Sequence, residues 1–427
     1  MKPKLLNSCI LLLAVAACLQ FGSTARATVA FSVTPSAVSN TYNGTIMLQV
    51  TGLTNSETVV VQKFLDLNTN GVIDAGDPLV QQFQLTDGQA GMVIGGIVNS
   101  NVPGDTDSTA GQITALLIFH NGDFIQNVAG QYAFKLSSPG GHFTPLTNLF
   151  TVTNSPYAQQ ITGNVVSNGT STALPNAIVL LFGPPRPGGK GPGGSPVAGA
   201  VANNSGGYTL LAPPGTYTPV AFKNGYVVNF STAPVIILGA GQTVTTNLTA
   251  TPATSSISGT LVDANNPGIA LPGVLLPAKN SGGLLAVGFT DANGLFNVPV
   301  TAGTWGLNPD DTALIVHGYL GWQNDYLTNA GATGVPLVVP KATALFYGNV
   351  KDGSGTPLPG IDVYAYDNGS QLYQADAYTD ANGRYAVGVL GGLGSNDPWS
   401  VQISSDGSPT NYIFSQPAFS QNGGTNL

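Results

Sequence analysis

The segment Thr290-Asp291-Ala292-Asn293-Gly294-Leu295-Phe296 and its near copy Thr379-Asp380-Ala381-Asn382-Gly383-Arg384-Tyr385 decide the fold of this chain. A third, more divergent copy reads Asn203-Asn204-Ser205-Gly206-Gly207-Tyr208. The asparagine–glycine pair tolerates a left-handed backbone, and the alternating apolar residues that follow are typical of a strand. Each copy therefore predicts a tight turn from which a strand begins.

The spacing of these turns indicates the size of the folding unit. The turn glycines Gly206, Gly294 and Gly383 lie 88 and 89 residues apart. A period of this length is too long for a solenoid repeat and suits one small β domain. We therefore expect an all-β chain of tandem β-sandwich domains that follow one another like beads.

Composition indicates an exported protein. Apolar residues make up 42% of the 427 residues and charged residues only 7%, alongside 56 glycines and 30 prolines. Cytosolic enzymes carry about 25% charged residues, so the low charge favours a secreted or cell-surface location. The apolar content is high enough for packed cores, which excludes a disordered chain.

The start of the chain has the features of an export signal. An apolar run covers residues 5–19, and Ala25-Arg26-Ala27 has the small residues of a cleavage site, which predicts a signal peptide over residues 1–27. The alternative is Val15-Ala16-Ala17-Cys18, which resembles a bacterial lipobox and would leave Cys18 as a lipid-anchored first residue. Both alternatives predict export.

The mature chain is acidic and has no cysteine. Cys9 and Cys18 both lie within the signal, so no disulfide supports the mature fold, and packing must hold it together. Removing residues 1–27 leaves nine basic and 20 acidic side chains, a net charge of −11, which argues against nucleic acid as a partner. No further stretch approaches the ~18 apolar residues of a transmembrane helix.

Residues 28–157 predict an immunoglobulin-like β-sandwich. Turn residues separate apolar, alternating segments at a spacing that is typical of such sandwiches. The six expected strands cover residues 44–53, 58–67, 78–86, 112–119, 131–136 and 146–153.

The loop between the second and third of these strands, residues 66–77, has the pattern of a calcium site. Oxygen-bearing side chains stand at loop positions 1, 3, 5, 9 and 12, and a glycine stands at position 6. The loop resembles those of EF-hands and bacterial dockerins. This resemblance implies a structural Ca²⁺ with the ligands Asp66, Asn68, Asn70, Val72 through its carbonyl, Asp74 and Asp77.

The resemblance covers these twelve residues alone and has two departures. Asp77 stands where the EF-hand has a longer glutamate, and the flanking segments read as strands, not helices. The shorter last ligand favours weak affinity, with a dissociation constant of about 10⁻⁴ to 10⁻³ M. The alternative is a polar hairpin loop that binds no metal.

Three repeats follow the first domain. Each begins with a strand that contains a glycine, continues with a leucine–proline pair, and then reaches the turn described above. This order resembles the carboxypeptidase regulatory-like family, transthyretin-type sandwiches related to Cna-B adhesin repeats and starch-binding modules. The resemblance implies three sandwiches, at residues 158–253, 254–344 and 345–427, with the third expected to be incomplete. Such domains serve as stalks, spacers, adhesin repeats or sugar-binding modules.

The second repeat contains a candidate carbohydrate-binding segment. Tyr319, Trp322 and Tyr326 lie among amide and carboxylate side chains, and aromatic faces beside such groups are suited to a sugar ring. The alternative is that these rings pack in a core or at a domain junction.

The sequence offers no catalytic constellation. His120, His142 and His317 are far apart, the mature chain has no cysteine nucleophile, and Gly-x-Ser-x-Gly is absent. We therefore expect a protein that is not an enzyme and acts as an exported surface scaffold or adhesive stalk, with cell-surface or extracellular polysaccharide or protein as partner. The alternative is an array of carbohydrate-binding modules or an accessory region of a polysaccharide-degrading system.

Overall fold

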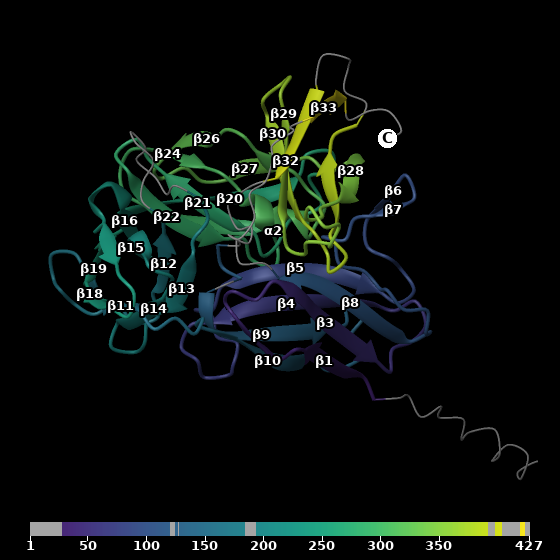
Figure 1. Cartoon of the computed structure of the whole chain (residues 1–427), viewed down its shortest axis with the longest axis horizontal. Helices are drawn as coiled ribbons and strands as arrows, with labels where there is room; N and C mark the ends of the chain where they lie inside the picture. The colour runs from purple at the N-terminus through teal and green to yellow at the C-terminus, as the bar shows by residue number, and fades with distance from the viewer. Residues whose placement is uncertain are drawn as a thin grey trace, which may run out of the picture.

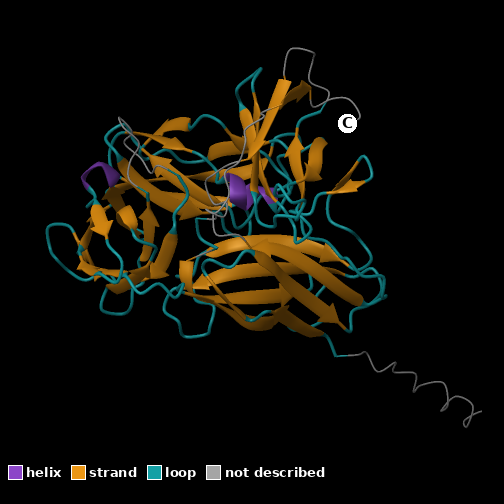
Figure 2. Cartoon of the chain, viewed as in Figure 1, coloured by secondary structure: helices purple, strands orange, loops and turns teal. Residues whose placement is uncertain are grey.

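The structure is a computed structural model of the chain, and it describes residues 28–119, 124–126, 128–183, 194–391, 398–403 and 419–422. Its regular structure is almost entirely β (Figure 2), and the described helices are α2 (Asp311–Ile315) and the 3₁₀ turn η1 (Phe230–Thr232). The predicted fold class, all-β with tandem β-sandwiches, is confirmed. The predicted signal peptide, the lipobox cysteine, His120 and the C-terminal end lie outside the described residues. No described helix combines the length and apolar character needed to cross a membrane.

The N-terminal sandwich consists of a three-stranded sheet, in the order β1-β3-β8, and a five-stranded sheet, in the order β5-β4-β9-β10-β2. Its strands are β1 (Ala30–Thr34), β2 (Ala37–Ser39), β3 (Gly44–Thr51), β4 (Thr58–Asp66), β5 (Leu79–Thr86), β6 (Val93–Ile94), β7 (Ile97–Val98), β8 (Gln112–Phe119), β9 (Val128–Ser137) and β10 (Leu146–Thr153). Buried residues alternate along β3, β4 and β8, as expected for strands with one face in a core. All six expected strands form, and β1, β2 and the β6–β7 hairpin are additional.

One lysine lies inside this core. Lys63 occupies one of the inward-facing positions of β4 and is 2% exposed. Its Nζ donates to Gln126 Oε1. The ammonium group lies 4.6 to 5.7 Å from the centroids of four rings, those of Phe119, Tyr132, Phe134 and Phe150. Cation–π attraction to these ring faces offsets part of the cost of removing the charge from water.

Strands of repeat 1 extend the second of these sheets, and the other strands of the three repeats form further sheets (Figure 1). Repeat 1 contains β11 (Gln160–Ser167), β12 (Ile178–Phe182), β13 (Ala198–Val201), β14 (Gly207–Leu211), β15 (Gly215–Phe222), β16 (Tyr226–Asn229), β17 (Ile236–Leu238), β18 (Thr243–Thr245) and β19 (Leu248–Pro252). Repeat 2 contains β20 (Ser255–Asp263), β21 (Leu275–Lys279), β22 (Leu284–Phe289), β23 (Leu295–Val300), β24 (Thr304–Leu307), β25 (Gly321–Trp322), β26 (Tyr326–Asn329) and β27 (Val335–Val339). Repeat 3 contains β28 (Ala344–Asn349), β29 (Asp362–Asp367), β30 (Tyr373–Tyr378), β31 (Arg384–Val389), β32 (Pro398–Ile403) and β33 (Phe419–Asn422).

The turn that recurs in the sequence has the same hydrogen bonds in each repeat. In repeat 2, Asp291 Oδ1 accepts the N–H groups of Asn293 and Leu295 at 2.8 and 2.9 Å, and the intervening glycine has a φ of +71°. Asn203 and Asp380 accept the corresponding pairs of N–H groups in repeats 1 and 3. A side-chain oxygen and a left-handed glycine therefore define the turn, as the sequence predicts.

The glycine in the opening strand of repeats 1 and 2 serves close backbone packing. A Cβ atom on Gly259 would lie 1.9 Å from the carbonyl oxygen of Val335 and 2.8 Å from the Phe296 ring. In repeat 1, a Cβ atom on Gly163 would lie 1.7 Å from the carbonyl oxygen of Thr246. The glycine therefore admits a neighbouring strand at a distance that no side chain would allow.

Neighbouring units share β-ladders, so they do not form separate beads. Strand β13 of repeat 1 pairs with β9 of the N-terminal sandwich, β16 of repeat 1 pairs with β22 of repeat 2, and β25 of repeat 2 pairs with β30 of repeat 3. Each junction extends a sheet across two units. The tandem units are therefore joined to one another by backbone hydrogen bonds between strand edges.

The last repeat also contacts the N-terminal sandwich. Asn101 of the N-terminal sandwich accepts the Tyr378 N–H of repeat 3 at 3.0 Å, and Asn43 Nδ2 donates to the Pro359 carbonyl at 3.3 Å. Met92, beside the β6–β7 hairpin, packs against the core of repeat 3. Figure 1 shows repeats 2 and 3 above the N-terminal sandwich, with repeat 1 beside it. The chain is thus a compact group of four units.

Candidate metal loop and the adjoining cavity

The β4–β5 hairpin carries the loop for which the sequence predicts calcium. Strands lead into and out of it, as the flanking sequence indicates. Gly71, at loop position 6, has a φ of +76°, so it provides the sharp bend that a calcium loop needs at this point.

The carboxylates at the two ends of the loop are buried and bind backbone N–H groups. Asp66 is 1% exposed, and its Oδ2 accepts the Gly71 N–H at 2.8 Å. Asp77 is 9% exposed, and its two oxygens accept the N–H groups of Leu67 and Asp74 at 2.9 and 2.8 Å. These hydrogen bonds join the two ends of the loop to each other and to its middle. The side chains of the first and last loop residues are therefore buried beneath the loop.

The other side chains predicted as ligands meet on the outer side of the loop. The amide nitrogens of Asn68 and Asn70 lie 2.8 and 2.7 Å from Asp74 Oδ2. The hydrogen bond from Asn68, and to a smaller extent that from Asn70, lowers the pKa of Asp74 below its usual value. Positions 3, 5 and 9 therefore converge.

The donor set suits a hard cation that takes oxygen ligands. Within the described ranges, however, no three histidine, cysteine or carboxylate side chains come close enough to hold a metal together. A cation here would depend on the amide oxygens of Asn68 and Asn70 and on the predicted carbonyl of Val72, besides carboxylates. The Val72 side chain is 60% exposed, and its N–H donates to Asn70 Oδ1 at 2.8 Å.

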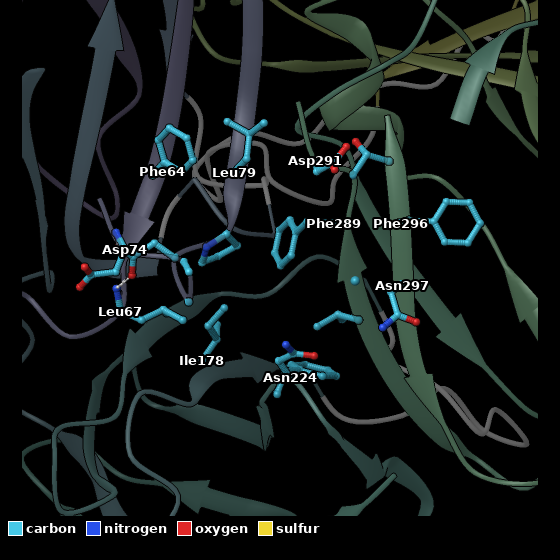
Figure 3. A pocket seen from close by; sticks show the side chains of 18 of the residues that line it. Phe64, Leu67, Asp74, Leu79, Ile178, Asn224, Phe289, Asp291, Phe296 and Asn297 are labelled. Atoms are coloured by element: carbon cyan, nitrogen blue, oxygen red, sulfur yellow. Dashed lines mark hydrogen bonds between the residues drawn. The ribbon is translucent and has the colours of Figure 1, made fainter. Parts of the chain in front are cut away.

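A cavity of about 640 Å³ adjoins the loop, where the N-terminal sandwich meets repeats 1 and 2. Figure 3 shows how each unit contributes to its wall. The residues include Leu67, Asp74 and Leu79 from the hairpin, Ile178 from repeat 1, and Phe289 and Asp291 from repeat 2. The wall combines apolar and polar side chains from all three units, so the loop lies at a junction and not on an isolated hairpin.

Of the three predicted sugar-binding aromatics, Tyr319 is buried and cannot contact a sugar. Its side chain is 5% exposed in the core of repeat 2, and its hydroxyl donates to Asp263 Oδ2 at 2.7 Å. Burial, and then the Asp263 carboxylate, raise the pKa of Tyr319. A ring enclosed on both faces cannot stack on a sugar, so Tyr319 belongs to the packing alternative.

Trp322 and Tyr326 lie at the junction of repeats 2 and 3. Their ring centroids are 6.4 Å apart with an interplanar angle of 32°, and Tyr326 is 39% exposed. Trp322 pairs with Tyr373 in the ladder between the repeats, and its carbonyl accepts Asn308 Nδ2 at 3.2 Å. These two rings therefore form a partly exposed aromatic pair.

The described histidines are not arranged for catalysis. His317 Nε2 lies 3.2 Å from the Pro272 carbonyl, and burial lowers the pKa of His317 to about 4. His142 Nδ1 lies 3.0 Å from Glu57 Oε1, and Ser138 Oγ donates to the same carboxylate oxygen at 3.3 Å. The serine hydroxyl thus bonds to the acid and not to an imidazole base, which is not the arrangement of an activated nucleophile.

Comparison with known proteins identifies no family. No protein-family model matches the chain, and no curated protein matches it. Among solved structures, the Bacillus anthracis TIE protein is similar over 98% of this chain and 76% of its own length, at 13% identity and a TM-score of 0.19. A Streptococcal ancillary pilin is similar over 67% of this chain and 92% of its own, at 13% identity and a TM-score of 0.19. BcpA, the major pilin subunit of Bacillus cereus, is similar over 61% of this chain and 94% of its own, at 11% identity and a TM-score of 0.19. Scores this low carry no inference about function.

Proposed function

We propose that this chain is an exported, non-catalytic scaffold in which calcium stiffens the junction between the N-terminal sandwich and the repeats. The repeats are of the carboxypeptidase regulatory-like type, and the protein acts at the cell surface or outside the cell. The low charge, the predicted signal peptide and the shared ladders between units support this proposal. Sheets that continue across junctions suit a protein whose task is to hold a shape.

The observation that carries the proposal is the position of the calcium-type loop. Asp74 and Asp77 border the cavity where three units meet, together with Ile178 of repeat 1 and Phe289 of repeat 2. An ion that orders residues 66–77 would therefore also order the surface against which both repeats lie. Calcium would then stabilise the arrangement of the units as well as one hairpin.

Calcium is expected to raise the thermal midpoint of the mature chain, residues 28–427. For a dissociation constant of about 10⁻⁴ to 10⁻³ M, 5 mM Ca²⁺ stabilises the folded state by about 1 to 2 kcal/mol. Differential scanning calorimetry with calcium, and again with EDTA, measures this shift. The double variant Asp66→Ala/Asp74→Ala is expected to lose the calcium-dependent shift, whatever its midpoint in EDTA.

Two further variants make this test specific. Asp74→Asn keeps a side-chain oxygen but removes the charge, so a weaker calcium-dependent shift is expected. Asp291→Asn is the control, because it borders the same cavity from repeat 2 and Asn203 stands at its place in repeat 1. The metal site would be refuted if calcium left the thermal midpoint of the unmodified chain unchanged. It would also be refuted if the double variant kept the full calcium-dependent shift of its midpoint.

The second candidate is carbohydrate binding at the aromatic pair of Trp322 and Tyr326. The partial exposure of the two tilted rings favours it, since a pyranose ring can pack its apolar face on such a surface. On a glycan array, Trp322→Ala and Tyr326→Ala are each expected to abolish binding, while Tyr347→Ala, at a 47% exposed tyrosine of repeat 3, retains it. Absence of glycan binding by the unmodified chain rules this candidate out and leaves the scaffold.

A further inference from the structure

One asparagine–glycine pair of repeat 1 differs from the others in its hydrogen bonding. An asparagine that precedes a glycine is chemically labile, because the glycine N–H lies close to the asparagine side-chain carbonyl and no Cβ atom crowds it. The described residues contain seven such pairs, which begin at Asn43, Asn70, Asn168, Asn224, Asn293, Asn368 and Asn382. The local structure decides how readily each pair can react.

In four of the pairs, a hydrogen bond within the turn holds the glycine N–H. The bonds run from Gly71 to Asp66 Oδ2, from Gly369 to Asp367 Oδ1, from Gly294 to the Asp291 carbonyl and from Gly383 to the Asp380 carbonyl, at 2.8 to 2.9 Å. Such a bond shields the N–H proton from base and fixes the direction of the nitrogen. These four glycines are therefore poorly placed to react with the preceding side chain.

In two further pairs, a hydrogen bond holds the asparagine side chain instead. Asn43 Nδ2 donates to the Pro359 carbonyl at 3.3 Å, and Asn168 Nδ2 donates to Thr251 Oγ1 at 3.1 Å. The side chain must rotate toward the following nitrogen before it can react, and this rotation breaks the bond. The fold therefore restrains these two asparagines as well.

Asn224 and Gly225 have neither restraint. Both residues are exposed, and within the described residues neither the Asn224 side chain nor the Gly225 N–H makes a hydrogen bond. The turn is closed by the Tyr226 N–H, which donates to the Lys223 carbonyl at 3.0 Å. Gly225 has a φ of +83°, and no atom lies within 4 Å of the place that a Cβ atom would take. The nitrogen and the side chain are therefore both open to solvent.

The pair also borders the cavity beside the candidate metal loop. Figure 3 shows Asn224 on the part of the wall that repeat 1 contributes, and Asp74 of the loop and Asp291 of repeat 2 line the same cavity. Lys223 lines it too, and its Nζ donates to the Pro175 carbonyl at 2.7 Å. An acid formed at Asn224 would add a negative charge to a wall that already carries carboxylates.

We propose that Asn224 is a site of spontaneous modification, at which this asparagine is converted into aspartate or isoaspartate in the folded protein. A base removes the N–H proton of Gly225, the nitrogen bonds to Asn224 Cγ, and the side-chain amide group leaves as ammonia. A five-membered imide results. Water then adds to one of the two imide carbonyls and opens the ring, which leaves either aspartate or isoaspartate. The reaction needs only water and base, and it is independent of calcium.

Mass spectrometry of the mature chain, residues 28–427, measures conversion at each pair in one experiment. The folded chain is incubated at mildly alkaline pH beside a sample unfolded in urea, and digestion with pepsin at acidic pH stops the reaction. The unfolded sample gives the rate that the local sequence alone allows. Asn224 is expected to convert in the folded chain at nearly its unfolded rate. Asn293 and Asn382 are expected to convert about tenfold more slowly in the folded chain, because their turn bonds must open first.

Asn224→Gln is the matched variant, because it keeps an amide but makes the side chain too long for a five-membered ring. It is expected to form less of the acidic species that accumulates on ion-exchange chromatography of the unmodified chain. Fluorescence of the buried Trp305 checks that both proteins stay folded. The assignment is overturned if Asn224 keeps its amide in the folded chain. It is also overturned if Asn293 converts in the folded chain as fast as Asn224.

Discussion

Replacing Gly259 with alanine is expected to unfold repeat 2 at temperatures at which the unmodified chain remains folded. The added Cβ atom would lie 1.9 Å from the carbonyl oxygen of Val335, and the obstacle is backbone, which cannot rotate away. Strands β20 and β27 would have to separate where they pair. Overpacking of this kind costs about 3 kcal/mol or more.

The core tryptophan of repeat 2 provides the measurement. Trp305 is fully buried and its Nε1 donates to the Thr301 carbonyl at 2.9 Å, so its fluorescence reports the loss of this core on heating. Gly353→Ala is the control, because no atom lies within 4 Å of a Cβ atom there. Equal midpoints for the two variants would show that the strand glycine has no packing role.

Replacing Thr290 with valine is expected to destabilise repeat 2 by about 2 to 4 kcal/mol. The Thr290 side chain is fully buried, and its hydroxyl donates to the Leu271 carbonyl at 2.7 Å and accepts the Val274 N–H at 2.8 Å. Valine has nearly the same shape but leaves both backbone groups without this partner. The cost therefore comes from hydrogen bonding and not from volume.

Urea unfolding followed by Trp305 fluorescence measures this cost. Thr290→Ser is the conservative variant, since it keeps the hydroxyl and loses one methyl group, and it should recover most of the stability. The same hydroxyl bonds are made by Thr379 in repeat 3, to the Leu358 carbonyl and from the Ile361 N–H. If valine and serine destabilise equally, the hydroxyl bonds are not what holds the leucine–proline segment against the turn.

Much of each unit could be predicted from the sequence because its signals are local. An Asx side chain and a glycine define the turn within five residues, and the alternation of buried residues along β4 follows from the strand period of two. No structural role is predicted from the sequence for the threonine that precedes the turn in repeats 2 and 3, Thr290 and Thr379. Its partners, such as Leu271 and Val274, lie 16 or more positions away, and no spacing rule relates them.

The local geometry of the candidate metal loop could also be predicted from the sequence, whereas its tertiary surroundings could not. The sequence indicated the hairpin, the bend at Gly71 and the convergence of positions 3, 5 and 9. Calcium occupancy stays a prediction. The cavity beside the loop was not foreseen, because Ile178 and Phe289, which complete its wall, come from repeats more than 90 positions further along the chain.

By itself, the sequence determined that this protein is all-β, built of tandem sandwiches, and free of a recognisable catalytic motif. Local turn chemistry and strand alternation are sufficient for that conclusion. Only the tertiary structure decided that the units share ladders, that Tyr319 is buried, and that Lys63 lies among four rings. Each of these features depends on contact between segments that are far apart in the sequence. Such a contact can bury a side chain or pair a strand edge whatever residues are next to it in the chain, so local sequence patterns do not predict it.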